Sequence, residues 1–93
     1  MTDRADILDT AKKLTCGDRD SSYGSPRENM DHIAALWNAY LDGRLRYPIT
    51  GADVAWMNAL IKAARCKTSP RKRDHYDDGA AYIAIAGECA EAE

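Results

Sequence analysis

The sequence contains no phenylalanine, and its 93 residues include only three prolines, three cysteines and two histidines. The cysteines form no Cys-x-x-Cys pair, which argues against a disulfide framework and against a structural zinc site. We interpret Cys16, Cys66 and Cys89 as reduced thiols. His32 and His75 fall in no His-Glu-x-x-His spacing, so a zinc hydrolase is not expected.

Long hydrophobic runs and a strong charge imbalance are also missing. Thirteen Lys and Arg against fifteen Asp and Glu give a formal net charge of -2, which argues against general attraction to DNA or RNA backbones. The N-terminus, MTDRAD, has no apolar stretch of signal-peptide length. The longest weakly polar run, residues 79–87, covers about half of a membrane span. We therefore expect a cytoplasmic protein without membrane contact.

Helical periodicity dominates the sequence that is present, and no run alternates with period two over more than a few positions. Ser25-Pro26, Thr50 with Asp53, and Ser69-Pro70 are typical helix starts, because they satisfy or avoid the unpaired amides of a first turn. The pattern predicts a single domain over residues 1–93, with helices at about 3–15, 26–42, 51–66 and 70–90. Short connections favour an all-α, compact four-helix bundle with roughly antiparallel neighbours. The lack of strand patterns excludes Rossmann and barrel folds.

The same periodicity predicts buried faces and self-association. On the third predicted helix the buried face comprises Val54, Met57, Leu60, Ile61 and Ala64. On the fourth, Tyr76, Ala80, Ile83 and Gly87 lie on one side, and this surface could serve either the core or a subunit contact. A single core of this size buries little apolar surface, and the Ala and Gly residues of the fourth helix allow another helix to approach closely. We therefore expect a homo-oligomer, at least a dimer, formed through helices with small or aromatic faces.

Acidic residues form two helical pairs that could carry chemistry. Asp74 and Asp78 lie one turn apart, with Tyr82 one turn further along the same helix. These acids either complement the helix dipole or bind a ligand or metal, and the sequence leaves both interpretations open. Glu28 with Asp31 offers a second acidic pair, and carboxylates of this kind hold Mg²⁺ together with phosphate oxygens.

Basic and aromatic residues suggest a ligand cleft next to these acids. Lys62 and Arg65 lie one turn apart and are suited to hold a phosphate. Arg19 and Tyr23 lie in a Gly-flanked loop, where a base could stack on the tyrosine or the ring could simply pack against the core. We predict that Asp74 and Asp78 lie within one side chain's reach of Lys62 or Arg65, in a cleft shared with this loop.

Taken in order, the motifs resemble a phage and prophage small-protein family of unknown function. The resemblance covers nearly the whole chain, including ITGADVAWMNALIKAAR and SPRKRDHYDDGAAYIAIAG. Its motifs are an Arg-x-x-x-Tyr-Gly loop, a Lys-x-x-Arg pair and an Asp-x-x-x-Asp pair followed by Tyr, represented here by Arg19, Tyr23, Gly24, Lys62, Arg65, Asp74, Asp78 and Tyr82. If a phage encodes the chain, its location would be the cytoplasm of the host cell.

More distantly, the arrangement is similar to the nucleotide modification associated domains of phages and to the MazG-like all-α nucleoside triphosphate pyrophosphohydrolases. These resemblances imply a nucleotide ligand, with Tyr23 at the base or ribose and Arg19, Lys62 and Arg65 at the phosphates. In the hydrolases, acidic helices hold Mg²⁺ over a triphosphate. The nearest equivalents here are Glu28 and Asp31 together with Asp74 and Asp77 or Asp78, although Arg27 stands where the first motif has an acid.

Three hypotheses follow from these observations. The first is a nucleotide-binding phage protein that holds a host defence signal out of solution and needs no cofactor. The second is a Mg²⁺-dependent pyrophosphohydrolase, in which Glu28, Asp31, Asp74 and Asp78 hold the metal. The third is an interaction protein that binds a host polypeptide.

Overall fold

The computed structural model describes residues 2–17 and 24–93, which form four packed helices and no strand. The helices are α1 (Arg4–Cys16), α3 (Pro26–Tyr40), α4 (Gly51–Arg65) and α5 (Arg73–Ala92). The predicted all-α class is therefore confirmed. The first three helices begin within one residue of their predicted starts, whereas α5 begins three residues later than predicted.

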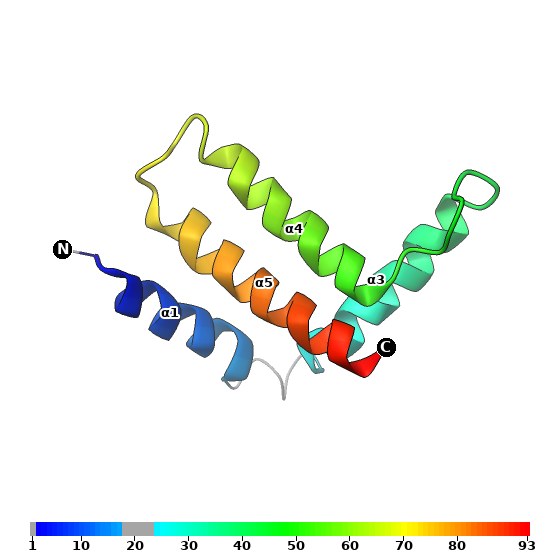
Figure 1. The fold of residues 1–93 in the computed structure, drawn as a ribbon, viewed down its shortest axis with the longest axis horizontal. Helices are drawn as coiled ribbons and strands as arrows, with labels where there is room; N and C mark the ends of the chain where they lie inside the picture. The colour runs from blue at the N-terminus through cyan, green and yellow to red at the C-terminus, as the bar shows by residue number, and fades with distance from the viewer. Residues whose placement is uncertain (1, 18–23) are drawn as a thin grey trace.

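The central element is α5, which packs against each of the other helices (Figure 1). α4 lies along one side of α5 and runs antiparallel to it, as predicted for neighbours. α1 lies along the other side and runs in the same direction as α5. α3 packs mainly against α4 and crosses the layer near the C-terminal end of α5. The result is a flattened molecule of 48 × 33 × 22 Å.

Local capping explains where α3 and α4 begin. The Ser25 hydroxyl accepts a hydrogen bond from the Glu28 amide at 3.1 Å. Thr50 and Asp53 form a reciprocal capping box, with both side chains accepting from the other residue's amide. These bonds satisfy first-turn amides that have no partner within the helix. The predicted starts at Pro26 and Gly51 are thus determined by residues adjacent in sequence.

The start of α5 departs from the sequence prediction. Ser69-Pro70-Arg71 does not open the helix; instead the Ser69 carbonyl accepts a hydrogen bond from the Lys72 amide at 3.2 Å and closes a turn. α5 begins at Arg73, and its N-cap residue, Lys72, provides no side-chain cap. Tertiary contacts supply the reason, because the Arg73 guanidinium hydrogen bonds to α1. The contacts of Arg73 with α1 therefore determine the start of α5, in place of the local Ser69-Pro70 signal.

The hydrophobic core is built mainly from small side chains contributed by α3, α4 and α5. Its buried members are Met30, Ala34, Ala52, Val54, Ala55, Ala86 and Cys89. Partly buried Ile33, Trp37, Ile49 and Ile85 pack around them. Alanines let helices approach closely, so α4 and α5 meet along a narrow seam.

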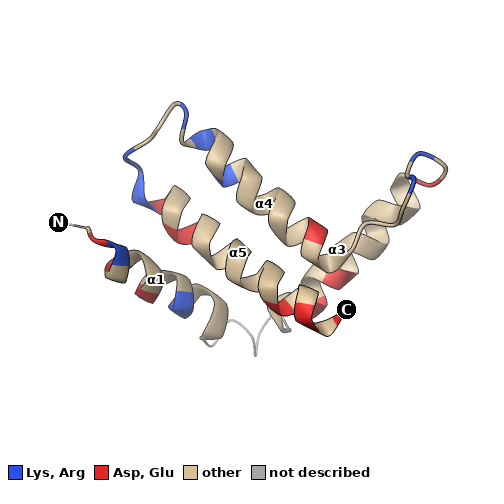
Figure 2. Cartoon of the chain, in the orientation of Figure 1, with Lys and Arg blue, Asp and Glu red and all other residues tan. Residues whose placement is uncertain are grey.

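Charged residues are unevenly distributed along α4 and α5. Acids lie at both ends of α5, and the stretch between them, residues 79–87, carries no charge (Figure 2). Basic residues lie at the C-terminal end of α4 and in the turn that leads to α5. The α4–α5 turn therefore brings cations beside the first acids of α5.

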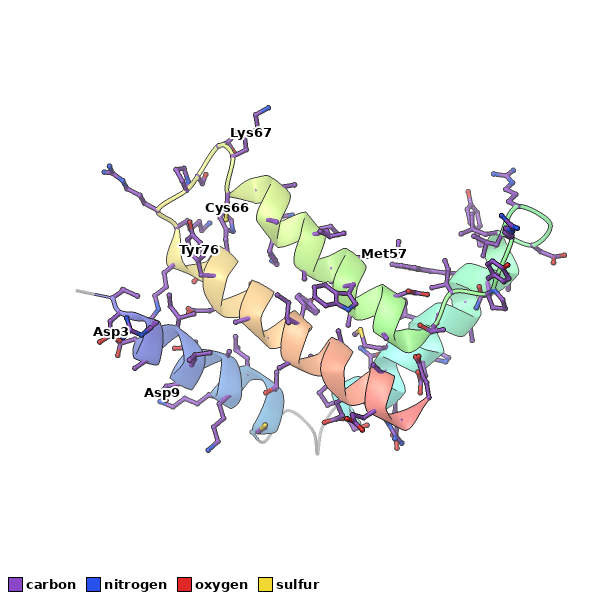
Figure 3. All side chains as sticks on the ribbon, viewed as in Figure 1. Asp3, Asp9, Met57, Cys66, Lys67 and Tyr76 are labelled. Carbon is purple, nitrogen blue, oxygen red and sulfur yellow. The ribbon has the colours of Figure 1, made fainter. Side chains whose placement is uncertain are left out.

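The predicted buried face of α4 is partly wrong. On α4, Val54 is buried as predicted, but Met57, Leu60 and Ile61 are 41%, 63% and 49% exposed. Met57 lies on the side of α4 that faces away from α5 (Figure 3). On α5, Tyr76, Ile83 and Gly87 are exposed, and the buried residues are His75, Asp77, Ala81, Ala86 and Cys89. The physical reason is that α4 is apolar on two sides, and its alanine side allows the closer approach to α5.

Candidate functional site

A pocket of about 250 Å³ opens between α1, α3 and α5. We call it the three-helix pocket, and its lining residues are Leu14, Thr15, Gly24, Pro26, Asn29, Met30, Asp78, Ala81, Tyr82 and Ile85. Three predicted site residues, Gly24, Asp78 and Tyr82, are among them. The pocket thus combines an apolar wall with hydroxyl, amide and carboxylate groups.

Gly24 adopts a backbone conformation that favours glycine. Its φ of +79° lies in the left-handed region, where a Cβ introduces strain. Among the described residues, an added Cβ would meet the Glu28 carboxylate at 3.8 Å, which is an ordinary van der Waals contact. The glycine directly precedes Ser25, the residue that caps α3. It therefore lets the chain enter α3 at the edge of the pocket.

Lys62 and Asp78 form an ion pair across the α4–α5 seam. The Lys62 Nζ lies 3.1 Å from the Asp78 Oδ2, and the two side chains are 20% and 35% exposed. A Cβ added at Gly79 would lie 3.8 Å from the Lys62 Cβ, so the two helices are in van der Waals range here. The predicted proximity of these two residues is present. Because Asp78 also lines the three-helix pocket, the Lys62 ammonium lies beside the pocket's wall.

The remaining predicted ligand residues are not gathered at this pocket. Arg65 and Asp74 are exposed, and neither lines it. Arg19 and Tyr23 lie outside the described residues. Their roles as ligand-binding groups stay predictions.

The predicted metal residues do not form a common site. Within residues 2–17 and 24–93, no three His, Cys, Asp or Glu side chains come together as a metal site. Glu28 is exposed at the start of α3, whereas Asp31 lies against Gly51 at the start of α4. Asp78 is already paired with Lys62. The metal-ligand roles of Glu28, Asp31, Asp74 and Asp78 stay predictions.

Sequence reasoning gave too little weight to Arg73 and Asp77. Asp77 is buried, at 6% exposure, and its carboxylate pairs with Arg73 at 3.2 Å. The Arg-x-x-x-Asp spacing is a recognisable helical ion-pair pattern. The contact of Arg73 with α1 spans 63 positions and leaves no local signal in the sequence.

Cys89 and Tyr76 are titratable groups whose pKa values are raised in the folded chain. Burial, and next the negative charges of Asp31, Glu88 and Glu93, raise the pKa of the Cys89 thiol. Tyr76 hydrogen bonds to the Pro70 carbonyl. A hydrogen bond involving Cys66, followed by desolvation, raises the pKa of the Tyr76 hydroxyl. Neither group lines the three-helix pocket, so both belong to the scaffold.

The fold and pocket describe an all-α protein of four packed helices with a small-molecule-sized cavity between three of them. The chain belongs to a family defined by a domain of unknown function (DUF6378), whose model matches residues 6–90. It is 41% identical over 76 residues to the Gene 55 protein of Mycobacterium phage D29, covering 82% of this chain and 48% of that protein. It is 38% identical over 79 residues to the Gene 55 protein of Mycobacterium phage L5, covering 85% and 49%.

These comparisons confirm the predicted relationship to a phage protein family of unknown function. The chain spans about half the length of the curated relatives it matches. No solved structure matches it. None of the helices in the described part of the chain has the length and apolar character that crossing a membrane requires.

Proposed function

We propose that this protein binds a nucleotide or a nucleotide-derived small molecule in the three-helix pocket. The observation that carries the proposal is the composition of the pocket. Leu14, Met30 and Ile85 provide an apolar wall, and Asn29, Asp78 and Tyr82 are polar groups among the lining residues. Apolar side chains together with polar groups that can orient a ligand are typical of small-molecule sites.

The pocket's size indicates which part of a nucleotide it would hold. Its volume of about 250 Å³ lies just below the ~300–1,000 Å³ usual for ligand pockets. In our proposal the base or nucleoside occupies this space, with the Tyr82 ring contacting the base. The Asn29 amide and the Asp78 carboxylate are suited to hydrogen bond to base edges or ribose hydroxyls.

Phosphates would lie outside the pocket, beside the α4–α5 seam. The Lys62 ammonium is 3.1 Å from a carboxylate oxygen of a lining residue, so a phosphate at the rim would meet this cation. A chain with a net charge of -2 needs such a local positive group to hold an anion. Arg65, Arg19 and Tyr23 remain predicted contributors to phosphate and base binding.

We further propose that the protein holds its ligand without turning it over. Among the described residues, no three His, Cys, Asp or Glu side chains gather as a metal site, so the pyrophosphohydrolase alternative has no preassembled metal site to support it. The relatives are phage proteins. A phage protein that retains a nucleotide signal of its host would remove that signal from solution, and this is the role we propose.

Calorimetry with a nucleotide panel, with and without Mg²⁺, tests the proposal. We expect binding without release of pyrophosphate or monophosphate. Tyr82→Ala should weaken affinity by about five- to 150-fold, since stacking on an aromatic ring is worth ~1–3 kcal/mol per base, and Tyr82→Phe should retain most of the affinity. Tyr40→Ala is the matched control, because Tyr40 is 82% exposed and outside the pocket.

Mass spectrometry of small molecules released on denaturing the purified protein provides a second measurement. A nucleotide carried over from the expressing cells would identify the ligand directly. Turnover of a nucleotide with Mg²⁺ would favour the hydrolase instead. The proposal is wrong if no member of the panel binds, or if Tyr40→Ala and Tyr82→Ala weaken binding equally.

A further inference from the structure

α4 carries a row of large apolar side chains on the side that faces away from α5. Trp56, Met57, Leu60 and Ile61 are 49%, 41%, 63% and 49% exposed. The opposite side of the same helix is buried through Ala52, Val54, Ala55 and Ala59. A helix that is apolar on all sides is normally buried on all sides. Contiguous exposed apolar side chains of this kind mark an interaction surface.

The row has an internal order along the helix. Steps of three and four residues place Asp53, Trp56, Met57, Leu60, Ala63 and Ala64 along one stripe, which we call the outer face of α4. The stripe starts with an acid, continues with two bulky side chains, has Leu60 at its middle and ends with two exposed alanines. Lys67 follows in the turn after the helix and points away from it (Figure 3).

This order is self-complementary when the helix is turned end for end. Asp53 and Lys67 lie seven residues before and after Leu60. Trp56 and Met57 lie four and three residues before it, and Ala63 and Ala64 lie three and four residues after it. A two-fold axis beside Leu60 would therefore place the two bulky side chains of one copy against the two alanines of the other. It would also place the acid, Asp53, opposite the base, Lys67. Both features favour a second copy of the same surface over an unrelated partner.

We propose that the outer face of α4 is the interface of a homodimer, in which two α4 helices pack antiparallel across a two-fold axis at Leu60. Leu60 then contacts Leu60 of the partner subunit. Trp56 and Met57 pack over Ala63 and Ala64 of the partner subunit. The small alanine side chains allow the two α4 axes to lie about 8–10 Å apart, as in ordinary helix pairs. Asp53 lies near Lys67 of the partner subunit at each end of the interface.

The interface leaves the three-helix pocket open. The pocket is lined by residues of α1, α3 and α5 and of the segment before α3, and no residue of α4 is among them. Lys62 points to the other side of α4, toward Asp78 on α5. The homodimer is therefore independent of the proposed nucleotide binding, and either proposal can fail alone.

Sedimentation equilibrium tests the dimer with a closely matched pair of variants. The native protein at tens of micromolar should have twice the 10.3 kDa mass of one chain. Leu60→Asp should have the mass of one chain and keep the helical circular dichroism of the native protein, since Leu60 is 63% exposed in a single chain. Leu8→Asp is the control, because Leu8 is a helical leucine at 61% exposure on α1 and should leave the dimer intact.

Oxidative cross-linking tests the two-fold register. In a Cys16→Ser background, Leu60→Cys should form a disulfide-linked dimer, because only residues close to the axis bring their Cα atoms within the ~7 Å that a disulfide spans. Leu8→Cys in the same background should not. Lys67→Glu should weaken the dimer, most clearly at low salt, by placing like charges opposite each other.

Two results would overturn the inference. One is a native protein that sediments as a single chain at hundreds of micromolar. The other is an assembly whose mass is unchanged by Leu60→Asp. A dimer that dissociates with Leu60→Asp but gives no Leu60→Cys cross-link would overturn the antiparallel register.

Discussion

The Arg73 Nε lies 3.2 Å from the Asp77 Oδ2, one turn further along α5. The same guanidinium donates hydrogen bonds to the Asp6 carbonyl at 2.9 Å and to the Thr10 hydroxyl at 2.7 Å, both on α1. Asp77 is 6% exposed. A single arginine therefore neutralises a buried carboxylate and joins the N-terminal helix to the central one.

Replacing Arg73 with alanine should lower the free energy of unfolding by about 3 kcal/mol, because a buried carboxylate then loses its charged partner. Urea unfolding of Arg73→Ala measures this loss. Arg71→Ala, which removes an exposed cation two residues earlier, should change stability by no more than about 0.5 kcal/mol. The Arg73→Ala/Asp77→Ala double variant should be more stable than Arg73→Ala alone. Equal effects of Arg71→Ala and Arg73→Ala would contradict this account.

Two helical glycines should respond to alanine with opposite signs. A Cβ at Gly87 on α5 would meet no atom of residues 2–17 or 24–93 within 4 Å, so Gly87→Ala should stabilise the protein by about 0.5–1 kcal/mol through a less flexible unfolded chain. A Cβ at Gly51 would overlap the Asp31 carboxylate and lie 3.2 Å from the Asp31 amide nitrogen. Gly51→Ala should therefore destabilise the protein by about 1–3 kcal/mol.

Thermal unfolding of the two glycine variants beside the native protein measures both changes. Adding Asp31→Ala to Gly51→Ala should recover part of the loss, because the overlapping carboxylate is gone. A Gly51→Ala variant as stable as the native protein would show that α3 and α4 are not in close contact at this point.

The raised pKa of Cys89 predicts a loss of stability in alkaline solution. The folded state disfavours the thiolate, because burial and the nearby acids oppose its charge. Stability linked to the protonated thiol is fully present below the ordinary thiol pKa of about 8.5 and declines as the pH rises above it, by up to about 1.4 kcal/mol per pH unit. Below pH 8 the thiol should contribute no pH dependence.

Denaturant unfolding between pH 7.5 and 10 measures this slope. Cys89→Ala should remove the thiol's part of the slope, whatever its effect at pH 7.5, whereas Cys16→Ser at an exposed site should leave the slope unchanged. Alkylation offers an independent measurement, in which Cys16 should react quickly and Cys89 only when the protein opens. Rapid alkylation of Cys89 in the folded protein would contradict the prediction.

The Lys62–Asp78 pair should matter more for ligand affinity than for stability. Both side chains are partly exposed, and such pairs contribute about 1 kcal/mol or less. Lys62→Met should therefore leave the melting temperature nearly unchanged. If the proposed phosphate contact is correct, it should weaken binding of a nucleoside triphosphate much more than binding of the matching nucleoside. Lys72→Met, at an exposed lysine before α5, is the control. Equal weakening of both ligands would exclude a phosphate contact for Lys62.

Local sequence signals determined the all-α class and most helix starts. Ser25 and Thr50 cap α3 and α4 by bonding amides three residues away, so a short stretch of sequence contains the whole interaction. The pairing of Lys62 with Asp78 could also be predicted from the sequence. Helical spacing puts one basic and one acidic pair on two helices that are expected to be neighbours. In each case the interacting groups are few and their partners are defined by helical geometry.

Only the tertiary structure decided which side of α4 is buried and where α5 begins. Periodicity does not distinguish the two apolar sides of α4, and the alanine side packs inward because small side chains allow α5 to approach closely. α5 begins at Arg73 and not at the Ser69-Pro70 start signal, because the Arg73 side chain hydrogen bonds to α1, more than 60 positions earlier in the chain. The three-helix pocket likewise joins Leu14, Gly24 and Tyr82. Contacts between distant segments depend on how helices pack in three dimensions, and neither capping nor periodicity encodes that packing.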